Sequence, residues 1–242
     1  MKQMAGKLRQ MRLTERHVGY LQPPVTSEQM PPPPEGMRAA TQADHDATIA
    51  ELLGPDRAGR EVWIFAYGSL IWKPACDFVE MRNGLVHGCH RAFCLGWNTR
   101  FRGSDENPGL MLALDRGGAC NGVLYRLPPD CIDACMTSLL EREMGWLPSA
   151  FPPRWVNARS GDRTIRALTF CIDRQSGRYV SGLSNAEIAG VLARAVGDRG
   201  SMAQYLHATV QHLEQVGIHD PHLWQLQALV ADQIEAAYEA DR

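Results

Sequence analysis

The sequence lacks any long apolar run, lacks a surplus of basic residues and contains very little lysine. No stretch of its 242 residues approaches the roughly 18–20 uncharged apolar residues that span a bilayer. The 25 lysines and arginines are balanced by 27 acidic residues, and only three of these cations are lysines. Without a broad positive field, nucleic acid would need a local basic patch, and none stands out. We therefore expect neither a membrane nor a nucleic-acid partner.

Disulfide and metal signatures are also missing. The seven cysteines form no C-x-x-C pair, and no set of cysteines and histidines has the spacing of zinc ligands. An odd number of cysteines in a long chain predicts reduced thiols and a cytoplasmic protein. The N-terminus carries charge but no apolar h-region, which is not typical of a secretory signal. Because nucleotide-binding motifs such as Walker A and G-x-G-x-x-G are absent as well, we expect no metal and no cofactor.

Proline and glycine divide the chain. Residues 1–40 are predicted to be a proline-rich N-terminal arm, since Pro23-Pro24 and Pro31–Pro34 favour polyproline II and exclude helix. Residues 41–242 have the composition of a globular domain and are predicted to form a single one.

The hydrophobic pattern predicts strands first and helices last, which indicates an α+β fold around a curved sheet or small barrel. Turns containing Gly, Asn or Pro, including Gly117-Gly118, separate the strands. The predicted strands are 62–67, 84–97, 110–114, 119–127 and 165–172. The first predicted helix begins after Thr41 or Asp44 and ends at Gly54-Pro55. The later predicted helices span 130–144, 184–196, 201–216 and 220–239.

The first strand leads into Tyr67-Gly68-Ser69-Leu70. Gly68 is free to adopt a positive φ and lets a ligand approach the backbone closely. Successive N–H groups in such a turn form a concavity that binds an anion or oxyanion. A plain turn at the end of a strand is the alternative, because short Gly-Ser turns are common.

The helix at 130–144 ends with a carboxylate on its apolar side. At about 100° per residue, Glu143 projects along the stripe of core-facing residues, while Glu141 points to the opposite side. A buried carboxylate must be paired, or its pKa must rise, and a perturbed carboxylate suits a general base. The alternative is a frayed helix end with Glu143 in solvent. The stripe consists of Ile132, Cys135, Met136, Leu139 and Leu140.

These motifs together resemble those of a known family. The segment Trp63–Pro74, with Tyr-Gly-Ser-Leu joined to Ile-Trp-Lys-Pro, is similar to the opening motif of ChaC-like, glutathione-specific γ-glutamylcyclotransferases. The similarity extends over about residues 62–230 and includes Arg142-Glu143, where the family carries its Arg-Glu pair. One departure is Ala66, where the family usually has glycine.

The resemblance implies a mixed, partly closed β-barrel flanked by helices, with residues 41–242 forming the catalytic domain. It implies that glutathione is cleaved to 5-oxoproline and Cys-Gly, with Glu143 as the general base. The glutathione-binding residues that it implies are Ile64, Phe65, Ala66, Tyr67, Gly68, Ser69, Leu70, Arg102 and Tyr205. Arg102 as a surface arginine and Tyr205 as a core tyrosine are the alternatives. We expect a monomer or a weak homodimer.

Two other functions remain open at this point. The chain could be a cyclotransferase for other γ-glutamyl peptides or amines, which would share the loop and the glutamate but differ in the pocket for the leaving group. It could also be a non-catalytic regulatory binding protein associated with cation transport. A pure binding protein has no need of an inward-facing base, so Glu143 favours an enzyme.

Overall fold

The computed structural model of the chain describes residues 10–21, 36–55 and 59–240. Pro23-Pro24 and Pro31–Pro34 of the predicted arm lie outside the described residues. Within the described part of the chain, no helix is both long enough and apolar enough to cross a membrane.

The chain forms two compact units. The unit that we call the barrel unit comprises residues 36–55, 59–95 and 112–179. The unit that we call the helical unit comprises residues 10–21, 96–111 and 180–240. Each unit therefore contains residues from distant parts of the sequence, and the predicted division at residue 40 stays a prediction.

The barrel unit is built on a closed barrel of five strands in the order β2, β4, β3, β6, β7. β2 with β4, β3 with β6 and β6 with β7 are antiparallel pairs, whereas β2 and β7 run parallel and close the barrel. The elements of this unit are β1 (Arg38–Ala39), α2 (Gln42–Leu53), β2 (Trp63–Ala66), β3 (Glu80–Asn98), β4 (Gly109–Arg126), α3 (Ile132–Glu143), β5 (Trp146–Leu147), β6 (Pro153–Ser160) and β7 (Arg163–Phe170). The last residues of β3 and the first of β4 belong to the helical unit.

Strand β2 lies inside this sheet because all four of its residues are apolar. Trp63 and Phe65 are at most 2% exposed, and such complete burial on both faces is typical of a strand with neighbours on each side. Ile64 pairs with Tyr125 of β4 on one side and with Leu168 of β7 on the other. The chain that leaves β2 therefore starts from a fixed position.

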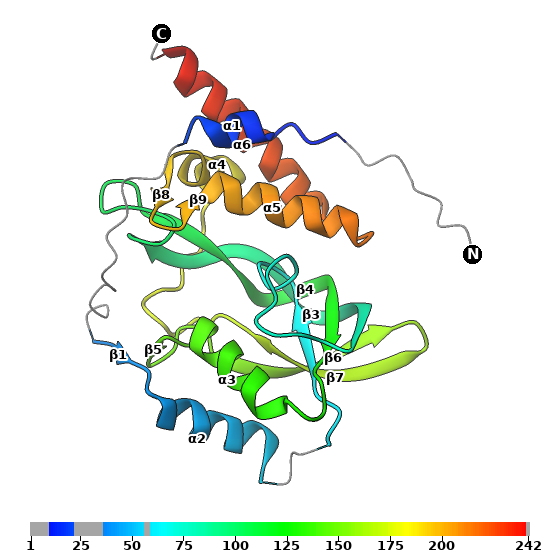
Figure 1. Cartoon of the computed structure of the whole chain (residues 1–242). Helices are drawn as coiled ribbons and strands as arrows, with labels where there is room; N and C mark the ends of the chain where they lie inside the picture. Colours follow the sequence, from blue (N-terminus) through cyan, green and yellow to red (C-terminus); the bar gives the residue numbers. More distant parts are fainter. Residues whose placement is uncertain (1–9, 22–35, 56–58, 241–242) are drawn as a thin grey trace. The chain divides into compact units, whose positions relative to one another are not determined.

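The helices α2 and α3 of the barrel unit lie side by side (Figure 1). Thr41 caps α2 by accepting the N–H of Asp44, and the Asp44 carboxylate accepts the N–H of Thr41 in return. The His45 ring of α2 contacts the carbonyl of Met144, directly after α3, with Nε2 3.4 Å from the oxygen. The two-stranded sheet of β1 and β5 makes a second connection near the same helix end.

In the helical unit, the helices α4, α5 and α6 pack against one another. Ser184 and Ser201 cap two of them by accepting N–H groups of the first turn, at Glu187 and Gln204. The elements of this unit are α1 (Glu15–Gly19), α4 (Asn185–Arg194), β8 (Val196–Gly197), β9 (Gly200–Ser201), α5 (Met202–Gln215) and α6 (Pro221–Ala240).

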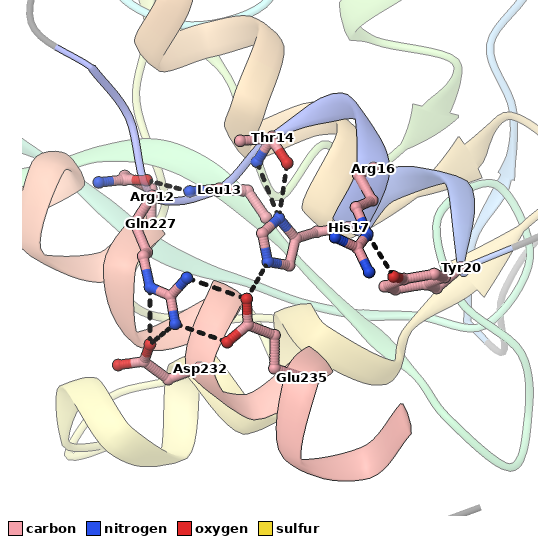
Figure 2. A network of polar contacts seen from close by, with 9 residues as sticks. All are labelled: Arg12, Leu13, Thr14, Arg16, His17, Tyr20, Gln227, Asp232 and Glu235. Carbon is pink, nitrogen blue, oxygen red and sulfur yellow. Dashed lines mark hydrogen bonds and ion pairs between the residues drawn. The ribbon is translucent and has the colours of Figure 1, made fainter. Parts of the chain in front are cut away.

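Residues 10–21 are anchored on this helical unit (Figure 2). Leu13 is fully buried, and its N–H donates to the side-chain oxygen of Gln227 at 2.7 Å. His17 accepts the N–H of Thr14 at Nδ1, so Nε2 carries the proton that it donates to Glu235 at 2.8 Å. Part of the predicted arm is thus a packed segment with a buried leucine.

The predicted α+β fold class is confirmed, and the five strands close the barrel completely. The turn predicted at Gly117-Gly118 is wrong, because β4 runs unbroken through both residues. Both glycines adopt positive φ, 100° and 71°, and such a pair fits a bulge inside a long strand.

Strand β6 was not predicted, because the alternation of apolar and polar residues is broken in its middle, at Trp155-Val156. It pairs with β7 across Gly161-Asp162, and Gly161 has a φ of 59°. This Gly-Asp pair is the hairpin signal that would have revealed the strand.

We expect Leu13→Ala to lower the free energy of unfolding by about 2–5 kcal/mol, because it leaves a cavity under the N-terminal segment. Urea denaturation followed by circular dichroism measures this change. Glu15→Ala, on the exposed face of the same short helix, is the control and should change stability by less than about 0.5 kcal/mol. Equal effects of the two substitutions would show that the segment is not anchored by Leu13.

Candidate active site

The loop after β2 is held by hydrogen bonds at both of its ends. The N–H of Ile71 donates to the carbonyl of Gly68 at 2.9 Å, and the N–H of Lys73 donates to Ser69 at 2.8 Å. At the start of the loop, the Arg91 guanidinium donates from Nε to the Tyr67 carbonyl at 2.6 Å. The loop is therefore a compact turn fixed to the barrel.

The Tyr67 hydroxyl adds a connection to the neighbouring strand by donating to the Phe170 carbonyl at 3.1 Å. Thr169, one residue earlier on β7, donates its hydroxyl to the Phe65 carbonyl at 2.9 Å. These buried side chains hold the end of β2 against β7, so they set the direction in which the loop leaves the barrel.

Three consecutive backbone donors of this loop are not used by the protein itself. Within the described residues, the structure shows no protein acceptor for the N–H groups of Gly68, Ser69 and Leu70. Consecutive N–H groups of this kind suit an anion or a developing oxyanion. This arrangement favours the anion-binding interpretation of the sequence over a plain turn.

Glu143 is the last residue of α3, and its side chain is only 16% exposed. The core-facing residues one and two turns earlier, Leu139 and Met136, are buried, whereas Glu141 is exposed. Glu143 therefore follows the apolar stripe of the helix, and the end of the helix is not frayed at this residue.

Arg142 joins this carboxylate to the loop. Its Nε lies 3.2 Å from Oε1 of Glu143, and its Nη2 donates to the Ser69 hydroxyl at 2.9 Å. Its Nη1 donates to the Lys73 carbonyl. One guanidinium thus contacts Glu143 and both ends of the turn from 69 to 73, which places the carboxylate and the loop in one site.

Burial dominates the electrostatics of this pair. Loss of solvent raises the pKa of Glu143 above its ordinary value, and the positive charge of Arg142 opposes the rise. A carboxylate held this way accepts a proton more readily than an exposed one. This property suits a general base that must later return its proton.

The other predicted site residues fall into two groups. Ile64, Phe65 and Ala66 are strand residues whose side chains belong to the barrel core. Arg102 and Tyr205 belong to the helical unit, where the guanidinium carbon lies 5.7 Å from the centre of the tyrosine ring.

Arg102 also donates to the carbonyl of Ser201 and to the side chain of Gln204, both at 3.0 Å. Burial lowers its pKa. Arg102 is therefore more than a solvated surface arginine, and Tyr205 is buried, as the alternative reading of a core tyrosine expected. Their contact with a substrate stays a prediction.

Arg91 was missed by the sequence reasoning. It is 5% exposed, and besides Tyr67 it contacts the carbonyl of Asn121. The available signal was a single arginine within the otherwise apolar end of the strand predicted over 84–97. In the described parts of the chain, no group of three His, Cys, Asp or Glu residues is arranged to hold a metal ion.

Comparison with solved structures places this architecture among the γ-glutamylcyclotransferases. A crystal structure of a γ-glutamyl cyclotransferase specific to glutathione from yeast superposes with a TM-score of 0.64. The match is 21% identical and covers 71% of this chain and 96% of the yeast chain, so it defines the fold.

Sequence comparison then defines the family. The model of the ChaC-like protein family matches residues 62–233, and the chain belongs to this family. A glutathione-specific γ-glutamylcyclotransferase of Escherichia coli K12 is 42% identical over 72% of this chain and 74% of its own length. Glutathione-specific γ-glutamylcyclotransferase 1 of Danio rerio is 31% identical over 69% of this chain and 87% of its own length.

Gly122 of β4 allows the loop strand to approach closely. A Cβ at this position would lie 2.5 Å from the Ala66 carbonyl oxygen and 2.5 Å from Cζ of Phe65. We expect Gly122→Ala to lower the free energy of unfolding by about 1–3 kcal/mol, because strand backbone and a packed ring must shift. Urea denaturation measures the loss.

Gly177→Ala is the matched control for this substitution. Gly177 has no heavy atom within 4 Å of the added Cβ and no positive φ. If the two alanine variants unfold at the same urea concentration, close packing at Gly122 is not a constraint.

Proposed function

We propose that this protein is a glutathione-specific γ-glutamylcyclotransferase that releases 5-oxoproline and Cys-Gly. The observation that carries the proposal is the Glu143 carboxylate, held by Arg142 beside a loop whose N–H groups at residues 68–70 have no acceptor in the described protein. The names of the E. coli and zebrafish relatives support the choice of substrate.

The reaction is an internal aminolysis of the substrate. The α-amine of the glutamyl group attacks its own side-chain carbonyl, the new C–N bond closes a five-membered ring, and the bond to the cysteinyl nitrogen breaks. Neither water nor an electron enters the balance. Because both reacting groups belong to one molecule, folding the substrate into a ring-like conformation supplies much of the acceleration.

Glu143 acts as the proton carrier in this proposal. The attacking amine must lose a proton, and the departing cysteinyl nitrogen must gain one. A carboxylate with a raised pKa performs both transfers, because its affinity for the proton lies closer to those of the donor and the acceptor.

The loop of residues 67–70 acts as the anion site. Its open N–H groups bind the α-carboxylate of the glutamyl group or the oxyanion that forms at the attacked carbonyl. Two further contacts with the substrate stay proposals: Arg102 with the Cys-Gly end, and the hydroxyl of Tyr205 at a position left open. We also propose a cytoplasmic setting, since all seven cysteines are free thiols and glutathione is abundant in reducing compartments.

The test incubates the purified full-length protein with glutathione and measures 5-oxoproline and Cys-Gly by mass spectrometry. Stoichiometric formation of both products is the expected result. A parallel reaction with γ-glutamyl-alanine should proceed far more slowly, and equal rates would indicate a broader cyclotransferase. Retention of unaltered glutathione in a calorimetric titration, without any product, would favour a binding protein and overturn the proposal.

We expect Glu143→Gln to lower kcat by about 10²–10⁴-fold, because the amide is isosteric but accepts no proton. Initial rates of 5-oxoproline formation measure the change. Glu141→Gln, on the exposed side of the same helix, should keep the rate of the unaltered protein. Retained turnover in Glu143→Gln would remove Glu143 from the role of base.

The pH dependence tests the role of Arg142. Activity requires ionised Glu143, and Arg142 lowers the pKa of this carboxyl against the effect of burial. Arg142→Gln removes the charge, so the pKa should rise further and the acidic limb of kcat/KM should move to higher pH. Rates measured across a pH series give the position of this limb.

Arg142→Lys separates charge from positioning. The lysine keeps the positive charge but cannot reach Glu143, Ser69 and Lys73 with one planar group. Its acidic limb should stay near that of the unaltered protein while kcat falls. A profile of Arg142→Gln that does not move would argue against electrostatic control of Glu143 by Arg142.

A further inference from the structure

Three of the seven cysteines gather on the two segments that form the candidate active site. Cys76 follows the loop, Cys131 is the N-cap residue of α3, and Cys135 lies one turn further along that helix. The side chains of Cys76 and Cys135 share a hydrogen bond, and Cys131 is close enough to interact electrostatically with both. All three are free thiols.

The exposure of the three thiols falls in steps from solvent to core. Cys131 is exposed, Cys76 is half-buried and Cys135 is 5% exposed. A small reagent therefore reaches Cys131 directly, whereas the buried Cys135 reacts with a neighbouring cysteine of the chain. This order of an accessible thiol followed by buried partners is the arrangement that intramolecular thiol exchange needs.

Burial also shapes the chemistry of the inner pair. It raises the pKa of Cys76 to about 12 and raises the pKa of Cys135, so both stay protonated and react slowly with an external reagent. In strongly oxidising dithiols, a stabilised thiolate favours the reduced form over the disulfide. Cys76 and Cys135 lack this stabilisation, so a disulfide between them is not disfavoured on that ground.

We propose that Cys131, Cys135 and Cys76 form a thiol–disulfide exchange site that reacts with a small-molecule disulfide and ends with a bond between the sulfurs of Cys76 and Cys135. The small disulfide is the oxidant, and it is reduced to two thiols.

The exchange proceeds in balanced steps. The Cys131 thiolate attacks the small disulfide, forms a mixed disulfide and releases the first small thiol. Cys135 loses its proton to solvent and attacks the Cys131 sulfur, which releases the second small thiol. Cys76 then loses its proton and attacks the Cys135 sulfur, which returns Cys131 to the thiol form. The protein loses two hydrogens in total, and the small disulfide gains them.

The disulfide between Cys76 and Cys135 would couple the oxidation state of these thiols to the geometry of the candidate active site. A disulfide holds its sulfurs about 2.05 Å apart, closer than two thiols approach, so bridging draws residue 76 toward α3. A small cavity of about 20 Å³ is lined by Cys76 together with Pro74 of the loop and Leu139 of α3. Lys73, whose carbonyl accepts from Arg142, lies only three residues before Cys76.

The test uses hydroxyethyl disulfide, because it has no γ-glutamyl group and cannot be a substrate of the proposed reaction. Full-length reduced protein is incubated with the probe, its remaining thiols are alkylated, and the intact mass and the cysteine peptides are measured. We expect the intact mass to show five alkylated cysteines where the reduced protein has seven, and we expect a peptide linking Cys76 to Cys135. A set of stable mixed disulfides without that link would overturn the proposal.

Variants test which thiol reacts first with the probe, here called the entry thiol, and which thiol then displaces the second small thiol. Cys131→Ser should slow the bridging at least about tenfold, and Cys135→Ser should stop the reaction at a mixed disulfide on Cys131. Bridging of Cys131→Ser at the rate of the unaltered protein would overturn the entry role. Unchanged far-ultraviolet circular dichroism checks that each variant folds.

Cys171→Ser is the matched control. Cys171 is half-buried like Cys76, and burial raises its pKa to about 11, but its thiol neighbour is Cys89. This variant should bridge at the rate of the unaltered protein, and slower bridging would argue against a site confined to the three cysteines.

A second readout follows the coupling to the site. Bridged protein freed of the probe should turn over glutathione at least about tenfold more slowly, and a reductant should restore the rate. An unchanged rate in fully bridged protein would overturn the coupling. The mass measurement is independent of any activity, so failure of the exchange site and failure of the proposed function are distinguishable.

Discussion

The side chain of Arg142 is the contact on which the candidate site depends. Adjacent residues on a helix point about 100° apart, so Arg142 and Glu143 would ordinarily serve different surroundings. The long arginine side chain instead turns toward both the carboxylate and the loop, where Ser69 and the Lys73 carbonyl accept its hydrogen bonds. This single planar group supplies the charge that offsets the burial of Glu143 and also fixes the loop that would bind an anion.

The barrel makes that contact reproducible. β2 is paired on both sides, and buried hydrogen bonds from Tyr67, Arg91 and Thr169 hold its end. Gly122 lets β4 approach this strand closely. A site placed on such elements keeps its geometry better than one placed on a long surface loop. The barrel unit thus carries Glu143 and the loop of residues 67–70, whereas the contact of Arg102 with Tyr205 belongs to the helical unit.

The thiol cluster uses the same two segments as the chemistry. Cys76 extends the loop, and Cys131 and Cys135 begin the helix that ends at Glu143. In the proposed exchange, a bond between Cys76 and Cys135 would act on the spacing between loop and helix, which is also the spacing that Arg142 spans. A site that relies on one guanidinium between two segments is therefore sensitive to a cross-link placed beside it.

The sequence by itself determined most of the helices and strands and the inward direction of Glu143. The apolar run of β2, the stripe of α3 and the serine and threonine caps are local patterns, so the strand, the helix and the inward direction of Glu143 followed from periodicity. Strand β6 does not follow from the local pattern, because the alternation breaks at Trp155-Val156 and pairing with β7 defines the strand. The pair Gly117-Gly118 predicts a turn, although both glycines lie inside the long strand β4.

Only the tertiary structure decided which groups meet. Arg91 and Tyr67 are 24 residues apart, and Arg142 and Ser69 are 73 apart, yet each pair shares a hydrogen bond. No local pattern encodes such pairs, because they arise when strands and helices distant in sequence close around a common core.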